Sequence, residues 1–294
     1  MANAKPIKMK AIVLGGSGFV GGYIAEHLNA IKTSFSGKAG FIKLDITKEN
    51  EVKNLFEKIK PNVVINSAAM ADVDRCEKEK EAANMINGAA VEWLASSANG
   101  VNAKFVQIST DYVFDGEIGN YKETDEPNPI NEYGKSKLLG EQNALKYDSI
   151  VIRIEMPYGI NLAKNKNVFF ESIIRNLKNG KRVNAAIDQI ISPTYIEDVA
   201  PAIESLLASG SKGIFHLASK ENLSRYEFSK LIAEVFDLDT SNIKKVRLDD
   251  FKLTAKRPKK TSLNTEKISR LFKINDIRDN LTEIKERYSD YINN

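Results

Sequence analysis

The feature that most constrains this chain is a glycine-rich segment near its start. The apolar run from Lys10 to Leu14 leads into the sequence GGSGFVGG at residues 15–22, and a helical pattern follows through Leu28. Glycine permits unusual backbone angles in a tight turn, and the missing side chains let N–H groups and a helix N-terminus approach a pyrophosphate. This strand–turn–helix order predicts a dinucleotide site. Its expected cofactor contacts are Gly15, Ser17, Gly18, Phe19, Val20 and Gly21.

The end of the next expected strand, near residues 33–36, bears on which dinucleotide binds. NAD-preferring folds place an acidic residue there for the ribose 2′-hydroxyl, yet no Asp or Glu occurs between Glu26 and Asp45. Ser36 and Lys38 lie there instead, and they can hydrogen-bond or neutralise a 2′-phosphate. The sequence therefore favours NADP(H), with NAD(H) as the second choice.

Strands and helices alternate along the first half of the chain. This order predicts an α/β fold with a doubly wound parallel sheet of the Rossmann type and a smaller C-terminal substrate-binding region. We expect a dinucleotide-binding domain over residues 1–156, with segments near 185–218 returning to it, and a mainly substrate-binding region over 157–294. Asp45 or Thr47 is expected to cap a helix, and Cys76 to Ala98 is expected to form one long helix.

A second motif combines a strand end with a tyrosine–lysine pair. Ser109 and Thr110 end an apolar run, where open α/β sheets bind ligands. Tyr133 and Lys137 are four residues apart, so both project from one face of a helix, where the lysine charge favours loss of the phenol proton. The spacing alone is weak, because Tyr226 and an equally spaced lysine also occur, but that tyrosine lacks the upstream context and is interpreted as helix surface.

Composition narrows the class of protein further. The net charge of +4 is modest, which favours anionic ligands without implying nucleic acid. A single cysteine excludes an internal disulfide, and two distant histidines without a ligand cluster make a metal site improbable. His216 is interpreted as a packed strand residue. No run reaches the length of a membrane span, so a cytoplasmic protein is expected.

The segment from residue 242 to residue 267 is strongly basic. A solvated surface explains most of its lysines as well as a binding site does. Arg257 is singled out, because a guanidinium pairs with phosphate in a bidentate way and could contact a substrate diphosphate.

Together these motifs resemble the extended short-chain dehydrogenases/reductases, and within them the dTDP-4-dehydrorhamnose reductase family. The resemblance covers nearly the whole chain. It is carried by the glycine turn, LDIT at 44–47, VINSAAMADVD at 64–74, STDYVFDG at 109–116, YGKSK at 133–137, DQIISPT at 188–194 and KRPKKTSLNTEK at 256–267.

The resemblance implies roles for these residues. Thr110, Asp111, Tyr133 and Lys137 would be the catalytic set, with Tyr133 as general acid and Lys137 holding the nicotinamide ribose. Asp45, Ile46, Ala68 and Ala69 would contact the cofactor. Ser109, Arg257 and Met156 would contact a nucleotide-sugar substrate, although Met156 stands where these reductases carry a tryptophan.

Two other functions share this motif set. One is a sugar-nucleotide epimerase. The other is a binding role like that of the regulatory subunit of methionine adenosyltransferase, which acts through a partner. The resemblance leaves the sugar, the nucleotide base and a homodimer open.

Overall fold

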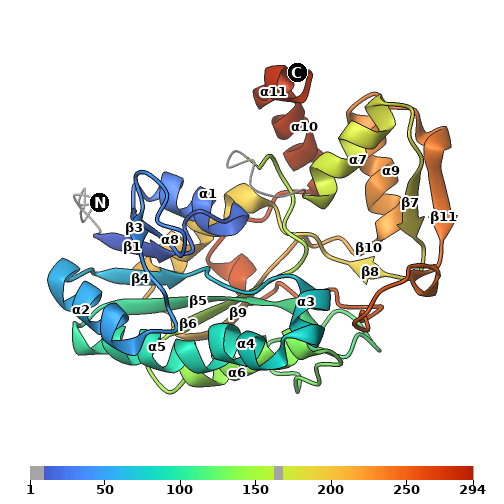
Figure 1. The fold of residues 1–294 in the computed structure, drawn as a ribbon. Coiled ribbons are helices and arrows are strands. Elements are labelled where there is room, and N and C mark those ends of the chain that lie inside the picture. The colour runs from blue at the N-terminus through green and yellow to red at the C-terminus, as the bar shows by residue number, and fades with distance from the viewer. Residues whose placement is uncertain (1–9, 162–167, 294) are drawn as a thin grey trace.

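A seven-stranded parallel sheet forms the centre of the molecule (Figure 1). The computed structural model describes residues 10–161 and 168–293. In spatial order the strands are β3 (Ile42–Lys43), β2 (Ile31–Ser34), β1 (Ala11–Leu14), β4 (Val63–Asn66), β5 (Lys104–Thr110), β6 (Ile150–Ile154) and β9 (Gly213–Leu217). The predicted doubly wound sheet is confirmed.

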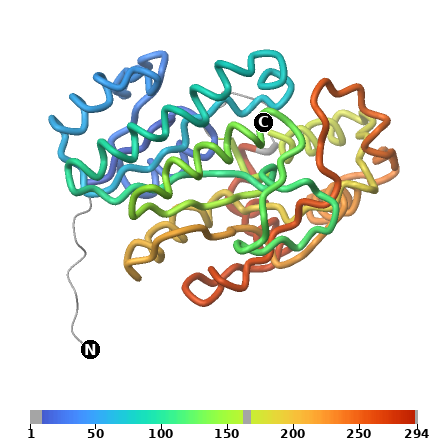
Figure 2. The backbone as a smooth tube through the Cα atoms, turned by 90° about the horizontal axis from the view of Figure 1, so that it is seen from below, coloured from blue at the N-terminus to red at the C-terminus, as the bar shows by residue number. Residues whose placement is uncertain are grey.

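Helices cover both faces of the sheet, which explains why its strands are apolar throughout. One face packs α1 (Phe19–His27) and α8 (Val199–Ala208), and the other packs α2 (Glu49–Ile59), α5 (Ala90–Gly100) and α6 (Glu132–Ala144). Seen from below, α5 and α6 lie side by side (Figure 2). Successive residues of β1 alternate between the two cores: Ile12 belongs to one and Val13 to the other.

A smaller group of elements lies beside the carboxyl edge of the sheet (Figure 1). It consists of the parallel pair β7 (Val183–Ala186) and β11 (Ile243–Val246), the antiparallel pair β8 (Ile190–Ile191) and β10 (Leu223–Ser224), and the helices α7 (Phe169–Lys178) and α9 (Arg225–Val235). The chain ends in α10 (Ile277–Arg287) and α11 (Ser289–Asn293). Phe170 and Phe228 of this group share one hydrophobic core with the sheet, so the two parts pack as a continuous body.

The single long helix expected over Cys76 to Ala98 is wrong. The chain instead forms α3 (Val73–Lys78), α4 (Lys80–Ala83), a π-helical turn η1 (Asn84–Ala89) and then α5. The wider turn directs the Asn87 amide toward the loop after β4, where it accepts from the Met70 N–H at 2.8 Å and donates to the Met70 carbonyl at 3.0 Å. A regular helix would forgo these buried hydrogen bonds.

The predicted cap of α2 is also wrong. The residue before the helix is Lys48, and no side chain caps it. Asp45 instead accepts hydrogen bonds from the Thr47 N–H at 3.0 Å and the Thr47 hydroxyl at 2.7 Å. Because the two side chains bond each other, they form a turn that ends before the helix begins.

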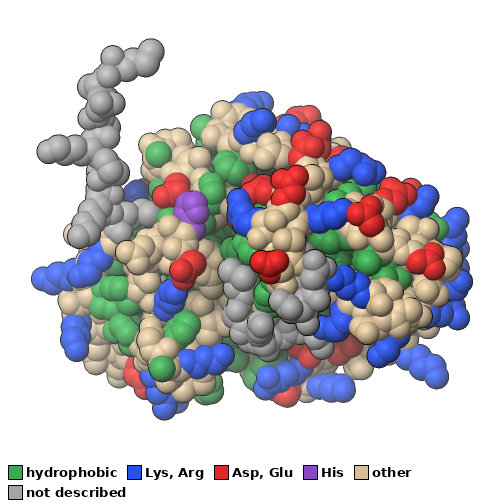
Figure 3. All heavy atoms as spheres, turned by 90° about the horizontal axis from the view of Figure 1, so that it is seen from above, with side chains coloured by type: hydrophobic (Ala, Val, Ile, Leu, Met, Phe, Trp, Pro, Cys, Tyr) green, Lys and Arg blue, Asp and Glu red, His purple; other side chains and the backbone are tan. Residues whose placement is uncertain are grey.

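The surface mixes charges of both signs. Lysine and arginine side chains are interspersed with acidic ones over the face drawn in Figure 3. Within residues 10–161 and 168–293, no helix is long and apolar enough to cross a membrane.

Candidate functional site

The glycine turn lies where the strand order reverses, between β1 and β4. Such a switch point opens a crevice at the carboxyl ends of the strands. Gly15 has a φ of +73°, and a Cβ there would lie 2.7 Å from the backbone of Ala68. Only glycine therefore fits between the two strand ends. Gly18 precedes α1 without a capping side chain, which leaves the helix N-terminus to a ligand.

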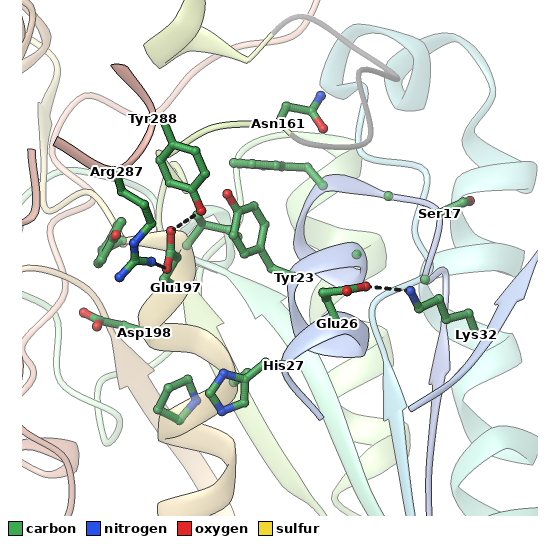
Figure 4. A pocket seen from close by; sticks show the side chains of 18 of the residues that line it. Ser17, Tyr23, Glu26, His27, Lys32, Asn161, Glu197, Asp198, Arg287 and Tyr288 are labelled. Carbon is green, nitrogen blue, oxygen red and sulfur yellow. Dashed lines mark hydrogen bonds and ion pairs between the residues drawn. The ribbon is translucent and has the colours of Figure 1, made fainter. Parts of the chain in front are cut away.

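A cleft of about 960 Å³ borders this turn, and Figure 4 shows it between α1 and α8. Ser17, Gly18 and Phe19 line one end of it together with Lys38 and Lys32. Lys32 pairs with Glu26 at 2.9 Å, a contact marked in Figure 4. Because Glu26 balances the charge of Lys32, Lys38 supplies the net positive charge at this end of the cleft.

The other predicted cofactor residues lie on α1 or follow β2, β3 and β4, outside the lining of this cleft. Val20 and Gly21 belong to α1, where Gly21 is buried and Val20 packs against the core. Ser36 is exposed beyond β2. Ile46 is buried, and its carbonyl accepts a hydrogen bond from the Trp93 indole at 2.7 Å. Ala68 and Ala69 follow β4, and Ala68 meets the glycine turn from the opposite side, whereas Ala69 is exposed.

The predicted catalytic residues come together at the end of β5. Thr110 ends that strand, and Tyr133 lies in the first turn of α6. The close approach of these elements depends on Gly134, where a Cβ would lie 2.1 Å from the Tyr112 carbonyl. Asn131 begins the helix by accepting from the Gly134 N–H at 2.8 Å. The cleft of Figure 4 does not reach this group, which lies at the carboxyl ends of β4–β6.

Burial controls the ionisation of the tyrosine and the lysine. It raises the pKa of Tyr133 above its ordinary value, and a hydrogen bond with Thr110 opposes the rise. Burial also lowers the pKa of Lys137 to about 8, while its ammonium donates to the Ile108 carbonyl at 2.7 Å. The lysine charge was expected to favour loss of the phenol proton; in the protein alone, desolvation has the larger effect on Tyr133 and acts in the opposite direction. Tyr133 is thus held as a neutral phenol, the form that gives a proton.

Ser109 belongs to a buried network behind the site. Its hydroxyl donates to Glu141, which forms an ion pair of 2.6 Å with Arg153. Both charged side chains are 1% exposed. His216 completes the network, with its Nε2 3.3 Å from the Arg153 guanidinium, and is a packed strand residue as predicted. Burial and the Arg153 charge lower its pKa to about 3.

Two arginines approach the site from the C-terminal region. Arg257 donates to Asp74 at 3.0 Å and to the Ala255 carbonyl at 2.8 Å. Arg225, which the sequence analysis missed, stacks on Phe169, with its guanidinium carbon 3.8 Å from the ring centroid. Across the part of the chain that the structure describes, Arg225 forms no ion pair. A guanidinium without a carboxylate partner suits an anionic ligand.

Met156 lies between Arg225 and the core. Its sulfur contacts the Arg225 guanidinium at 2.6 Å, and its φ of +36° is uncommon for a residue with a side chain. Sequence spacing could not indicate Arg225, because this residue begins α9 about seventy residues after Met156, which it contacts.

This fold and site define an extended short-chain dehydrogenase/reductase, a class of NAD(P)-dependent oxidoreductases. Residues 9–290 match the family described as the RmlD substrate binding domain. The chain belongs to that family.

Named relatives include a reductase and a subunit of methionine adenosyltransferase. The chain is 32% identical over 298 residues to a probable low-salt glycan biosynthesis reductase of Haloferax volcanii, with 96% of this chain and 99% of the relative covered. It is 30% identical to methionine adenosyltransferase 2 subunit beta of Danio rerio, over 89% of this chain and 84% of the relative.

Solved structures support the same family. A hypothetical dTDP-4-dehydrorhamnose reductase from Sulfolobus tokodaii is 39% identical with a TM-score of 0.83, covering 91% of this chain and 96% of that one. The dTDP-4-dehydrorhamnose reductase of Bacillus anthracis, in complex with NADP, is 29% identical with a TM-score of 0.87, covering 96% of this chain and 100% of that one.

Proposed function

We propose that this protein reduces the 4-keto group of a nucleotide-linked 6-deoxy sugar with NADPH, as a dTDP-4-dehydrorhamnose reductase does. The observation that carries the proposal is the group formed by Thr110, Tyr133 and Lys137, which lies at the sheet edge that also holds the glycine turn. The named reductases among its relatives support the same reaction.

The described residues fit a dinucleotide. Residue 15 has no room for a Cβ against Ala68, so the backbone of the turn stays bare. The uncapped start of α1 can receive a pyrophosphate. Lys38 at the cleft is placed to neutralise a 2′-phosphate. NADPH would supply the hydride for the carbonyl carbon, and NADH is the alternative donor. On this assignment residues 1–156 and the returning segments bind the dinucleotide, while 157–294 mainly bind the sugar nucleotide.

The residues of the site divide the chemistry between them. The Thr110 hydroxyl, which donates to Asp111 in the protein alone, turns its hydrogen to the substrate carbonyl and orients it. Tyr133 gives its phenol proton to the carbonyl oxygen as negative charge develops there. Lys137 remains largely protonated at neutral pH, because its pKa is about 8. Its charge therefore favours the transient phenolate and can hold a ribose hydroxyl.

Two arginines of the C-terminal region are placed to bind the substrate. Arg225 forms no direct ion pair within the described ranges and lies close enough to Tyr112 to affect its ionisation. Arg257 is oriented by Asp74. Together they favour a substrate with a diphosphate.

A direct assay tests this function. The purified protein, mixed with NADPH and dTDP-4-dehydrorhamnose, should oxidise the nicotinamide and release dTDP-rhamnose in equal amounts. A matched reaction with the Tyr133→Phe variant controls for a contaminating reductase. Absence of the sugar product across thymidine, uridine and guanosine diphosphate forms would overturn the proposal.

A second function is a dinucleotide-binding regulatory subunit. The relation to methionine adenosyltransferase 2 subunit beta favours it. Mixing the chain with a methionine adenosyltransferase catalytic subunit and following sedimentation separates the two. A stable complex without any keto-sugar reduction would support this alternative.

A further inference from the structure

Two buried carboxyl groups follow neighbouring strand ends, where Thr110 of β5 pairs with Ile154 of β6. Asp111 begins the short turn η2 (Asp111–Val113) and is 4% exposed, while Glu155 follows β6 and is 1% exposed. The charge of Glu155 acts directly on the ionisation of Asp111. Two ionised carboxylates at this depth repel each other and lose hydration, so one of them is expected to keep a proton.

The hydrogen bonds of Glu155 show that it carries the charge. Its Oε2 accepts from the Ser192 N–H at 2.8 Å and from the Ser192 hydroxyl at 2.6 Å. Its Oε1 accepts from the Thr261 hydroxyl at 2.6 Å. The Leu263 N–H donates to the Ser192 oxygen at 2.8 Å, which leaves the serine hydrogen for Glu155. Three donors directed at one carboxyl stabilise its ionised form.

The hydrogen bonds of Asp111 stabilise its charge less well. The Thr110 hydroxyl donates to its Oδ1 at 3.0 Å, and Thr261 lies close enough to favour the ionised form only if its hydrogen is free to turn toward Asp111. A threonine hydroxyl has one hydrogen, and that of Thr261 is already given to Glu155. The Thr261 hydrogen is therefore unavailable to Asp111, which is left with the Thr110 hydroxyl as its side-chain donor, against the three donors directed at Glu155. Burial and the Glu155 charge raise the pKa of Asp111 well above its ordinary value, in the same direction.

Other charged groups face this pair from neighbouring elements. Arg225 of α9 lies within electrostatic reach of both carboxyls and attracts the single negative charge. Negative charge on Asp111 or Glu155 raises the pKa of Tyr112 of η2, and negative charge on Asp111 raises the pKa of Tyr133 of α6. A charge on Asp111 would thus oppose the loss of a proton from Tyr133.

We propose, on the basis of the reductase function above, that Asp111 and Glu155 share one proton held on Asp111, and that Glu155 thereby makes Tyr133 a better proton donor. Glu155 is a positioning residue that never touches the substrate. It confines the negative charge to the end of the pair away from Tyr133. No proton leaves the pair during turnover, since Tyr133 gives its own proton to the substrate and regains one from solvent.

The variant Glu155→Gln tests the sharing without removing volume. The oxygen of the new side-chain amide can still accept from Ser192, and its nitrogen can donate to Thr261, which then turns its hydrogen toward Asp111. Asp111 becomes the remaining carboxyl of the pair; it loses the repulsion of Glu155 and gains the Thr261 donor, so its pKa falls and more of it is ionised at neutral pH. Turnover should fall about 10- to 100-fold as the charge moves next to Tyr133, with NADPH affinity unchanged.

The direction of the pH effect is specific. Asp111 is already neutral in the wild type, so its turnover should not rise as the pH falls from about 7 to about 5. Turnover of Glu155→Gln should rise over that range, because acid returns a proton to Asp111. Adding Asp111→Asn to Glu155→Gln should recover part of the lost turnover, since position 111 becomes neutral again. Equal turnover and equal pH profiles in wild type and Glu155→Gln would overturn the proposal.

An infrared measurement tests the shared proton without any substrate. At about pH 9, where an ordinary carboxyl is ionised, the wild type should retain the carbonyl band of one protonated acid. The band should vanish in Glu155→Gln and in Asp111→Asn. Asp198 is a matched control, because burial raises its pKa to about 7 and Asp198→Asn should leave the band intact.

The two assays separate this inference from the reductase function. A missing band in the wild type overturns proton sharing even if the protein reduces keto sugars. A chain that shows the band but reduces no keto sugar would refute the reductase function and, with it, the role assigned to Glu155 in tuning Tyr133.

Discussion

The Lys137 ammonium donates a 2.7 Å hydrogen bond to the carbonyl of Ile108. Lys137 lies one helical turn after Tyr133 on α6. This bond ties α6 to β5, whose last residue is Thr110. Lys137 is 4% exposed and is therefore both a structural contact and a charge within the site. Its ionisation connects the fold to the chemistry.

The first prediction follows from that ionisation. Burial lowers the pKa of Lys137 to about 8, so its charge is lost as the pH rises through that value. We expect kcat/KM to decline above about pH 8, since this ratio reports ionisations of the free enzyme. The Lys137→Met variant should be slow and lack this decline. Lys135→Met, at an exposed position on the same helix, should behave as the wild type; an unchanged profile in Lys137→Met would refute the assignment.

Cofactor choice gives a second prediction. No carboxylate follows β2 to repel a 2′-phosphate, and Lys38 lines the cleft beside the glycine turn. NADPH should bind at least as tightly as NADH, and Lys38→Ala should weaken NADPH about tenfold, a loss of about 1.4 kcal/mol. NADH affinity should be unaffected. Calorimetric titration measures both, with Lys53→Ala on α2 as a control; a clear preference for NADH in the wild type would contradict the prediction.

Arg225 gives a third prediction. Its guanidinium stacks on Phe169 and forms no ion pair in the described part of the chain. Arg225→Met keeps the apolar stem but removes the charge, so KM for the sugar nucleotide should rise about 10- to 100-fold, in line with about 1.5 to 3 kcal/mol for a charged hydrogen bond. NADPH affinity should stay the same. Arg278→Met, an exposed position on α10, serves as the control, and an unaltered KM in Arg225→Met would exclude this residue from the substrate side.

The buried ion pair behind the site gives a prediction about stability. Arg153 and Glu141 are each 1% exposed, and Ser109 also donates to Glu141. Glu141→Gln would leave the arginine charge uncompensated, which costs about 3 to 5 kcal/mol in the free energy of unfolding. Urea denaturation measures this change. Asp148→Asn, which breaks an exposed contact with Lys212, should leave stability unchanged, and two equal effects would argue against the role of burial.

The sequence was most informative where neighbouring residues act together. The glycine turn, the strand before it and the Tyr133–Lys137 spacing are local patterns, and each appears in the structure where it was expected. Arg225 and Glu155 were missed because their partners are remote in the chain. Glu155 meets Ser192 and Thr261 through packing of the C-terminal region, which no periodicity records.

Local reasoning also failed where tertiary contacts override helix propensity. The pattern from Cys76 to Ala98 is continuously helical in character, yet the buried hydrogen bonds of Asn87 with Met70 favour a π-helical turn there. The basic segment illustrates a similar limit. Lys259 pairs with Asp188 and Asp249, so part of that charge is used within the fold.

The most direct test of the central claim is the turnover of Tyr133→Phe with NADPH and dTDP-4-dehydrorhamnose. Loss of the phenol proton should lower kcat by about 10² to 10⁴, while NADPH affinity stays within error of the wild type. Tyr226→Phe, the matched tyrosine on α9, should keep normal turnover. Normal turnover in Tyr133→Phe would contradict the assignment of Tyr133 as the proton donor and the function built on it.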